Sequence, residues 1–224
     1  MTGVVVVIDV IRAFTTAAYA FDRGAQTIFL TDTPESAFDL RIRFPGALLM
    51  GEIDGLPIAG FDFGNSPSLL ASIDLSGRNL IQRTSAGTQG MVRSVNAQHL
   101  LAGSFVCAQA TADYIRRLLA EQVTFVITGA RPGTNFNHPF SGGGDEDAAC
   151  ADYIEATLLG QALDPMPFLR RVRNSPAGIA LASSTREGIP PDDLEWCLAL
   201  DRFNFAMPVQ REDGLLAMRR LINF

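Results

Sequence analysis

The sequence predicts an α/β fold, in which a mostly parallel or mixed β-sheet carries helices on both faces and a C-terminal subregion over residues 145–203 is mainly helical. Short apolar runs alternate with helical patterns as far as residue 128, which is typical of a parallel sheet. Beyond residue 144 helical patterns dominate. We expect residues 1–224 to form a single domain, because this length can bury one large core and no low-complexity linker interrupts the chain.

The first predicted strand is the β-branched run Val4–Ile8, which is typical of a strand buried on both faces. Asp9 follows this strand, and Arg12 comes three residues later. The alanine-rich stretch that follows predicts a helix that ends at Gly24. A carboxylate at the end of a buried parallel strand lies where α/β folds bind ligands. Asp9 is therefore either a ligand-binding residue or only the N-cap of the helix.

The remaining elements follow from periodicity and from cap residues. Short apolar runs predict strands at residues 27–30, 47–50, 79–82, 98–102, 123–128 and 204–209. Helices are predicted at residues 34–40, 107–119, 145–160, 165–173 and 192–200, and a short one begins at Pro67 with Ser66 as its cap. A loop over residues 129–144 is rich in Gly, Pro and Asn, and loops of this length are usually functional.

Composition excludes several classes of protein. The net charge of −6 argues against a nucleic-acid partner, and no apolar stretch is long enough for a membrane span. All 18 basic residues are Arg, which excludes a Walker A loop and any Schiff-base or lysine-base mechanism. The 2 histidines cannot build a His-rich zinc site. The 3 cysteines lack CxxC spacing and the first residues lack a signal-peptide pattern, so we expect reduced thiols and a cytoplasmic location.

Polar residues follow several predicted strands and should meet at one edge of the sheet. These residues are Asp9, Arg12, Glu52, Thr84, Ser85, Gly87, Thr88 and Ser104. The turn over residues 84–88 is either an anion cradle of hydroxyl and N–H groups or an ordinary N-capped turn. Arg12 offers a bidentate contact to phosphate.

Carboxylates on separate elements suggest a metal ion. Asp9, Glu52 and Asp147 are hard oxygen ligands that suit Mg²⁺. The alternative for Asp147 is that it stabilises the dipole of the helix that begins nearby. Other familiar sites are absent from the sequence, since no G-x-G-x-x-G follows a strand and no G-x-S-x-G occurs.

Stretches spread over nearly the whole chain resemble, in order, motifs of the 2-phosphosulfolactate phosphatase family. The matching stretches are VVVIDVIRA at 5–13, GE at 51–52, GFDFGNSP at 60–67, TSAGT at 84–88, GSF at 103–105, EDAACA at 146–151 and EWCLALD at 195–201. The first and third of these are the most specific. In the fourth, Ser85-Ala86 stands where the family has Thr-Asn, which removes a side-chain amide from the predicted cradle.

The resemblance implies an α/β fold, a cytoplasmic homodimer and Mg²⁺-dependent phosphatase activity. The named member of the family acts in coenzyme M biosynthesis and hydrolyses 2-phosphosulfolactate to sulfolactate and phosphate. This chain is therefore expected to act on a small anionic phosphorylated acid, with neither a nucleic-acid nor a membrane partner.

We assign roles to these residues as follows. Asp9, Glu52 and Asp147 would hold Mg²⁺, and Arg12 would neutralise the phosphate. The attacking group is either water or Asp9 itself. The alternatives are another metal-dependent hydrolase on the same scaffold and a non-catalytic anion-binding module. The expected substrate-binding residues are Asn65, Ser66, Thr84, Ser85, Gly87, Thr88 and Ser104.

Overall fold

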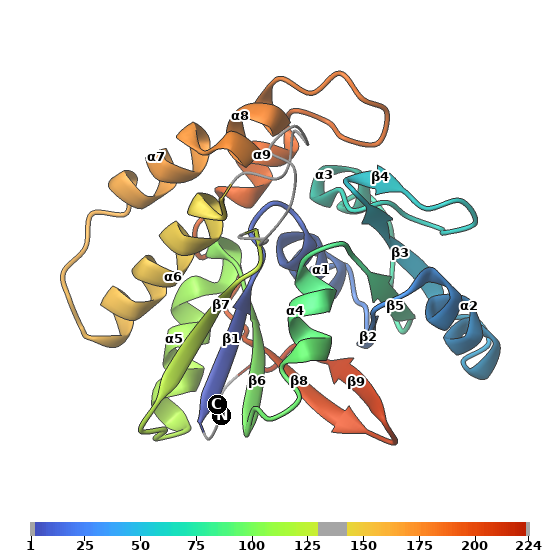
Figure 1. The fold of residues 1–224 in the computed structure, drawn as a ribbon, viewed down its shortest axis with the longest axis horizontal. Helices are drawn as coiled ribbons and strands as arrows, with labels where there is room; N and C mark the ends of the chain where they lie inside the picture. Colours follow the sequence, from blue (N-terminus) through green and yellow to red (C-terminus); the bar gives the residue numbers. More distant parts are fainter. Residues whose placement is uncertain (1–2, 130–142, 223–224) are drawn as a thin grey trace.

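The structure, a computed structural model, describes residues 3–129 and 143–222 (Figure 1). The predicted loop over residues 129–144 falls mostly outside the described residues. The strands are β1 (Val4–Ile8), β2 (Thr27–Thr31), β3 (Leu48–Ile53), β4 (Leu56–Pro57), β5 (Asn79–Arg83), β6 (His99–Gly103), β7 (Val123–Ile127), β8 (Met207–Glu212) and β9 (Leu215–Met218). The helices are α1 (Ala13–Asp22), α2 (Pro34–Arg43), α3 (Pro67–Leu70), α4 (Gly87–Arg93), α5 (Ala108–Arg117), α6 (Asp145–Leu158), α7 (Met166–Asn174), α8 (Pro176–Ala182) and α9 (Asp193–Cys197), with a 3₁₀ turn η1 (Phe105–Cys107) before α5.

The predicted α/β fold is confirmed, with a mixed sheet. Within the described residues the strands form one 9-stranded sheet in the order β4-β3-β5-β2-β9-β8-β6-β1-β7. β1 lies between β6 and β7 and is parallel to both, while β5 lies between β2 and β3 and is parallel to both. The hairpin of β8 and β9 joins these two parallel blocks and pairs antiparallel with β6 on one side and β2 on the other.

The two parallel blocks run in opposite directions along the pairing order, yet their carboxyl ends come together. Adjacent strands are rotated by roughly 20–25°. From β3 to β1 there are six steps, so this twist adds up to roughly 120–150°. The pairing pattern makes the two blocks antiparallel, and a rotation of this size brings their strand directions most of the way back into agreement. The polar residues that follow β1, β3 and β5 can therefore share one site, although the sheet is not parallel throughout.

Both faces of β1 are buried, as the run of β-branched residues predicts. Val5 and Val7 pack in a cluster with α1 and α4, whereas Val4, Val6 and Ile8 pack in a second cluster with α5 and α6. Each of these residues is at most 1% exposed. The strand is therefore held from two sides, and so is the position of the residue that follows it.

The C-terminal subregion is helical as predicted, and it covers the carboxyl end of β1. In Figure 1 the helices α7, α8 and α9 lie beyond the ends of β1 and β7, and the segment between α8 and α9 extends toward α3. The ion pair between Arg12 and Asp193 connects this region to the start of α1. No helix in the described residues is long and apolar enough to cross a membrane.

Candidate active site

Two buried carboxylates, Asp9 and Asp147, meet at the carboxyl end of β1. Asp9 directly follows β1, and Asp147 lies in the first turn of α6. Thr128 Oγ1 lies 3.4 Å from Asp9 Oδ2 and 3.2 Å from Asp147 Oδ2. The register pairs Ile8 with Ile127, so Thr128 follows β7 at the same level as Asp9 follows β1. The sheet thus brings together acids that lie far apart in the sequence.

Backbone N–H groups fix the orientation of both carboxylates. Asp147 Oδ1 accepts a hydrogen bond from the N–H of Val10 at 2.8 Å, and its Oδ2 accepts one from the N–H of Gly129 at 2.9 Å. Asp9 Oδ1 accepts the N–H of Ala13 at 2.9 Å and so caps the first turn of α1. Asp9 thus supplies a hydrogen bond to the first turn through one oxygen, although the N-cap residue of α1 is Arg12, and its other oxygen lies near Thr128.

Gly87, at the start of α4, lies directly against Asp9. A Cβ atom on this residue would stand 2.8 Å from Asp9 Oδ2 and 3.0 Å from the Cβ of Ala13. The close approach of α4 to Asp9 therefore requires glycine at this position.

The site concentrates negative charge. Burial raises the pKa of Asp9 above its usual range, and the charge of Asp147 raises it further. Burial also raises the pKa of Asp147, and the next largest cause is the charge of Glu146. Glu146 is only 4% exposed, and its Oε2 has no hydrogen-bond partner within the described residues. A bound cation would offset this excess of buried carboxylates.

The turn that precedes α4 is closed by its own hydroxyl groups. Thr84 N–H donates to Thr88 Oγ1 at 2.8 Å, and Thr88 N–H donates to Thr84 Oγ1 at 3.1 Å. Neither residue is exposed. Ser85 Oγ accepts the N–H of Asp54 at 2.8 Å. The N-cap residue of α4 is Ala86, which makes no side-chain cap bond, and the threonine hydroxyl groups of the turn contact protein atoms. Substrate binding by these residues stays a prediction.

Glu52 holds the same turn through its carboxylate. Its Oε1 accepts the N–H of Ser85 at 2.5 Å, and its Oε2 accepts the N–H of Gly55 at 2.6 Å. Within residues 3–129 and 143–222, no group of three or more His, Cys, Asp or Glu side chains is arranged to hold a metal ion. Both oxygens of Asp147 accept backbone N–H groups as well, so this bonding does not separate Glu52 from Asp147 as a ligand. The predicted metal set of Asp9, Glu52 and Asp147 stays a prediction.

Arg12 is buried in an ion pair. Its Nη1 lies 2.7 Å from Asp193 Oδ2, and the two side chains are 4% and 0% exposed. Ser66 caps α3 through the N–H of Leu69, and its hydroxyl also donates to Asp193 Oδ1 at 2.9 Å. The predicted site residues Arg12 and Ser66 therefore meet through a carboxylate that the sequence analysis did not select.

Asn65 and Ser104 differ in what they offer a ligand. Asn65 is 5% exposed, and its Oδ1 has no hydrogen-bond partner among the described residues. Ser104 is fully buried, and its hydroxyl lies 2.6 Å from the hydroxyl of Thr15. In this conformation Ser104 contacts protein atoms instead of facing a ligand, whereas the unpaired oxygen of Asn65 suits a substrate-binding residue.

Comparison with known proteins assigns the family. The family model described as 2-phosphosulpholactate phosphatase matches residues 1–212. A protein of Bacillus subtilis (strain 168), described as a probable 2-phosphosulfolactate phosphatase, is 32% identical over 218 residues, which cover 97% of this chain and 91% of that protein. A protein of Carboxydothermus hydrogenoformans with the same description is 32% identical over 219 residues, covering 96% and 89%.

This chain belongs to the 2-phosphosulpholactate phosphatase family. The resemblance that the sequence motifs predicted is thereby confirmed. The motifs of this family that lie far apart in the sequence converge in the structure. The first contains Asp9 and Arg12, the TSAGT stretch brings Gly87 to Asp9, and the EDAACA stretch supplies Asp147.

The pair Asp9 and Asp147 suits Mg²⁺ in this family member. Mg²⁺ is usually held by one or two carboxylates, while water and substrate phosphate oxygens complete its coordination. Both carboxylates are buried, and burial raises the pKa of each, an effect that a bound cation would offset. Mg²⁺ binding by these carboxylates stays a prediction.

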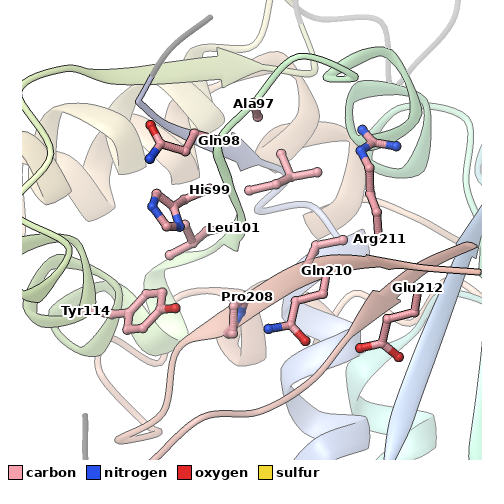
Figure 2. A pocket seen from close by; sticks show the side chains of 11 residues that line it. Ala97, Gln98, His99, Leu101, Tyr114, Pro208, Gln210, Arg211 and Glu212 are labelled. Atoms are coloured by element: carbon pink, nitrogen blue, oxygen red, sulfur yellow. The ribbon is translucent and has the colours of Figure 1, made fainter.

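A separate cavity of about 420 Å³ lies at the opposite end of β6 (Figure 2). Gln98, His99 and Tyr114 line one side of it, and Arg211 lies on the other. His99 pairs with Val4 at the start of β1, whereas Asp9 follows its end. This cavity is therefore not part of the Asp9 site.

Two residues of the site were not found from the sequence. Thr128 was included in a strand, and the only signal for its role was its place at the end of a strand beside β1. Asp193 was assigned to the start of a helix. Its partner Arg12 is 181 residues away, and no local pattern connects the two.

Proposed function

We propose that this chain is a Mg²⁺-dependent phosphatase that hydrolyses a small phosphorylated organic acid, similar to 2-phosphosulfolactate, to the 2-hydroxy acid and phosphate. The observation that supports this most strongly is the buried pair of Asp9 and Asp147, which meets at Thr128. The descriptions of the relatives support the class of substrate.

The residues divide the work as follows. Asp9 and Asp147 would hold Mg²⁺, which supplies Lewis-acid stabilisation of charge on phosphate oxygens when it is bound. Arg12 would bind a phosphate oxygen and offset the charge that moves to the leaving oxygen. Asn65, whose Oδ1 is unpaired within the described part of the chain, would contact the substrate.

The attacking group is either water or Asp9. If Asp9 attacks, an aspartyl-phosphate forms and is then hydrolysed, so that a burst of alcohol release precedes steady turnover. Acid quenching during turnover would then trap phosphate on the protein. If water attacks directly, neither the burst nor the trapped phosphate occurs.

The proposal is tested with a panel of phosphate esters of small organic acids, assayed for phosphate release with and without Mg²⁺. We expect release that depends on Mg²⁺, and a loss of at least ~10²-fold in Asp9→Asn, because that carboxylate serves the metal or the attack. Asp39→Asn on α2, which makes the same change at an exposed position, is the control and should keep full activity.

Two results would reject the phosphatase proposal. The first is that none of the esters releases phosphate under any metal condition. The second is that Asp9→Asn retains full activity. If wild type and Asp9→Asn bind inorganic phosphate equally well without hydrolysing any ester, the chain is an anion-binding module.

The homodimer and the cytoplasmic location are further proposals, supported by the resemblance and by the free, buried cysteines Cys107, Cys150 and Cys197. Light scattering coupled to size-exclusion chromatography measures the oligomeric state directly, and a monomer at micromolar concentration would reject the homodimer.

A further inference from the structure

The guanidinium of Arg12 is held at one end by a buried carboxylate. Nη1 donates to Asp193 Oδ2 at 2.7 Å and approaches the carbonyl oxygen of Gly188 at 3.4 Å. Gly188 lies in the segment that joins α8 to α9, and Asp193 is the first residue of α9, far along the chain from β1. The start of α1 is therefore connected to the C-terminal helical region through one nitrogen of Arg12.

Asp193 is itself fixed by groups other than Arg12. Its Oδ1 accepts hydrogen bonds from Ser66 Oγ at 2.9 Å, from the Ser68 N–H at 3.1 Å and from Ser68 Oγ at 2.5 Å. These donors belong to the N-terminal end of α3. One carboxylate oxygen thus anchors Asp193 to α3, and the other is left for Arg12.

Two nitrogens of the guanidinium, Nε and Nη2, have no hydrogen-bond partner among the described residues. Arginine carries five N–H donors on three nitrogens. The side-chain hydrogen bonds of Arg12 to the described residues use Nη1 alone. The edge formed by Nε and Nη2 is the one that binds two phosphate oxygens at once when a partner holds Nη1.

Stability alone does not explain such a buried pair. Removing two charges from water costs about as much as their attraction returns, and apolar replacements of buried ion pairs are often neutral or stabilising. A buried charge that fixes the direction of a ligand-binding group has a function that an apolar pair cannot supply.

We propose that Asp193 is the positioning residue for Arg12. It holds Nη1 so that the Nε–Nη2 edge meets the phosphate group of the substrate, and Ser66 and Ser68 hold Asp193 in place. The inference rests on the proposed function, in which Arg12 binds phosphate. It also gives Ser66 a different role from the one predicted, because Ser66 acts through Asp193.

A double-mutant cycle tests this with inorganic phosphate as the probe, measured by calorimetry and as a competitive inhibitor of ester hydrolysis. Asp193→Asn keeps an oxygen for Ser66 and Ser68 but places an amide against Nη1. Arg12→Gln keeps an N–H donor for Asp193 but removes the charge. We expect each change to weaken phosphate binding about tenfold or more, because each removes a charge-assisted hydrogen bond or its geometry.

The double variant, which combines Arg12→Gln with Asp193→Asn, separates positioning from a structural role. The two amides that it introduces can bond to each other as a neutral pair, so its melting temperature should recover relative to Asp193→Asn alone. If Asp193 acts through Arg12, phosphate binding by the double variant stays at the level of Arg12→Gln. If the effects on binding are additive, or if binding recovers with the fold, the positioning role is rejected.

Controls keep the outcome clear. Asp192→Asn changes the exposed neighbour in the same way and should leave phosphate binding unchanged. Ser68→Ala leaves the ion pair intact, so it should weaken phosphate binding severalfold while the melting temperature changes little. This variant tests the same proposal if Asp193→Asn does not fold. Unchanged binding in a folded Ser68→Ala variant would count against the proposal.

The proposed function and this inference can fail separately. If wild type binds phosphate and the cycle shows non-additivity, but no ester is hydrolysed, the phosphatase proposal fails and the positioning role stands. If wild type does not bind phosphate, Arg12 is not a phosphate ligand and the positioning role is rejected.

Discussion

At the scale of single residues, Asp9 combines two tasks on its two carboxylate oxygens. Oδ1 caps α1 through the N–H of Ala13, which fixes the rotamer of the side chain. Oδ2 then points toward Thr128 and the pair with Asp147. The hydrogen bond to Ala13 therefore orients the other oxygen, so that a change at Asp9 should affect both the start of α1 and the proposed site.

The carboxylate pair makes the stability of the metal-free protein depend on pH. Burial raises the pKa values of Asp9 and Asp147 above the usual 3.8; the charge of Asp147 raises that of Asp9 further, and the charge of Glu146 raises that of Asp147 further. The unfolded chain therefore releases these protons at lower pH than the folded chain does. The free energy of unfolding is therefore largest below the pKa of 3.8 that Asp has in the unfolded chain. It falls as the pH rises from there through the raised pKa values of the folded chain.

Mg²⁺ should reverse this trend. In thermal unfolding followed by circular dichroism, we expect Mg²⁺ to raise the melting temperature more at about pH 8 than at about pH 5. Sodium chloride at the same ionic strength is the control, and Asp9→Asn should lose most of the effect. A Mg²⁺ effect of equal size in Asp9→Asn would show that the metal binds elsewhere.

Residue roles were predictable only where a local signal existed. Asp9 and Asp147 carry such a signal, because each is an acid at a recognisable strand end or helix start within a family motif. Thr128 and Asp193 carry none, because their roles come from contacts across the fold. The rotamer of Glu52 was equally hidden, since its partners are backbone N–H groups of two turns.

At the scale of elements, the approach of α4 to β1 depends on a missing side chain. In Gly87→Ala the new Cβ would stand 2.8 Å from Asp9 Oδ2 and 3.1 Å from Phe14 Cζ, so α4 or Asp9 must shift. We expect a loss of about 1–3 kcal/mol in the free energy of unfolding, measured by urea denaturation, and a fall in activity.

Gly64→Ala is the matched control for this change. A Cβ at Gly64 would meet its nearest atom, Pro57 Cγ, at 3.6 Å, which is an ordinary contact. We expect the stability of this variant to change by less than about 1 kcal/mol. If Gly87→Ala and Gly64→Ala had the same free energy of unfolding, the claim that a Cβ at residue 87 clashes with Asp9 would be rejected.

The predicted elements up to residue 128 are close to the observed ones, because each predicted apolar run becomes a strand, although the short β4 was not predicted. The C-terminal part was less accurate. The strand expected at residues 204–209 begins at Met207 and continues to Glu212, and β9 and α8 were not predicted. Asp213 and Gly214 both have positive φ and form the two-residue turn between β8 and β9. An Asp-Gly pair is a strong hairpin signal, so the sequence contained this information.

At the scale of the whole molecule, the sheet has a layout that local patterns cannot reveal. Each parallel block follows from strand–helix alternation, whereas the reversal between the blocks comes from a hairpin near the C-terminal end of the chain. The direction in which β8 and β9 insert between β6 and β2 is determined by contacts between distant parts of the chain. The sequence therefore predicts a parallel or mixed sheet without saying how its blocks are joined.

A single cooperative unit should result from this layout, because the central hairpin bonds to both blocks. Urea unfolding followed by the fluorescence of Trp196, the single tryptophan, and by far-ultraviolet circular dichroism should give coincident transitions. Separate midpoints for the two probes would instead indicate two units, and would contradict the single domain that we predicted.

The central position of the β8–β9 hairpin also has a consequence for biosynthesis. These two strands are translated after every other strand of the described sheet, yet they join its halves. Until they emerge from the ribosome, β2 and β6 of the nascent chain each present an unpaired edge to other chains. Completion of this sheet is therefore a late event, and the nascent chain is a natural client for chaperones that shield exposed strands.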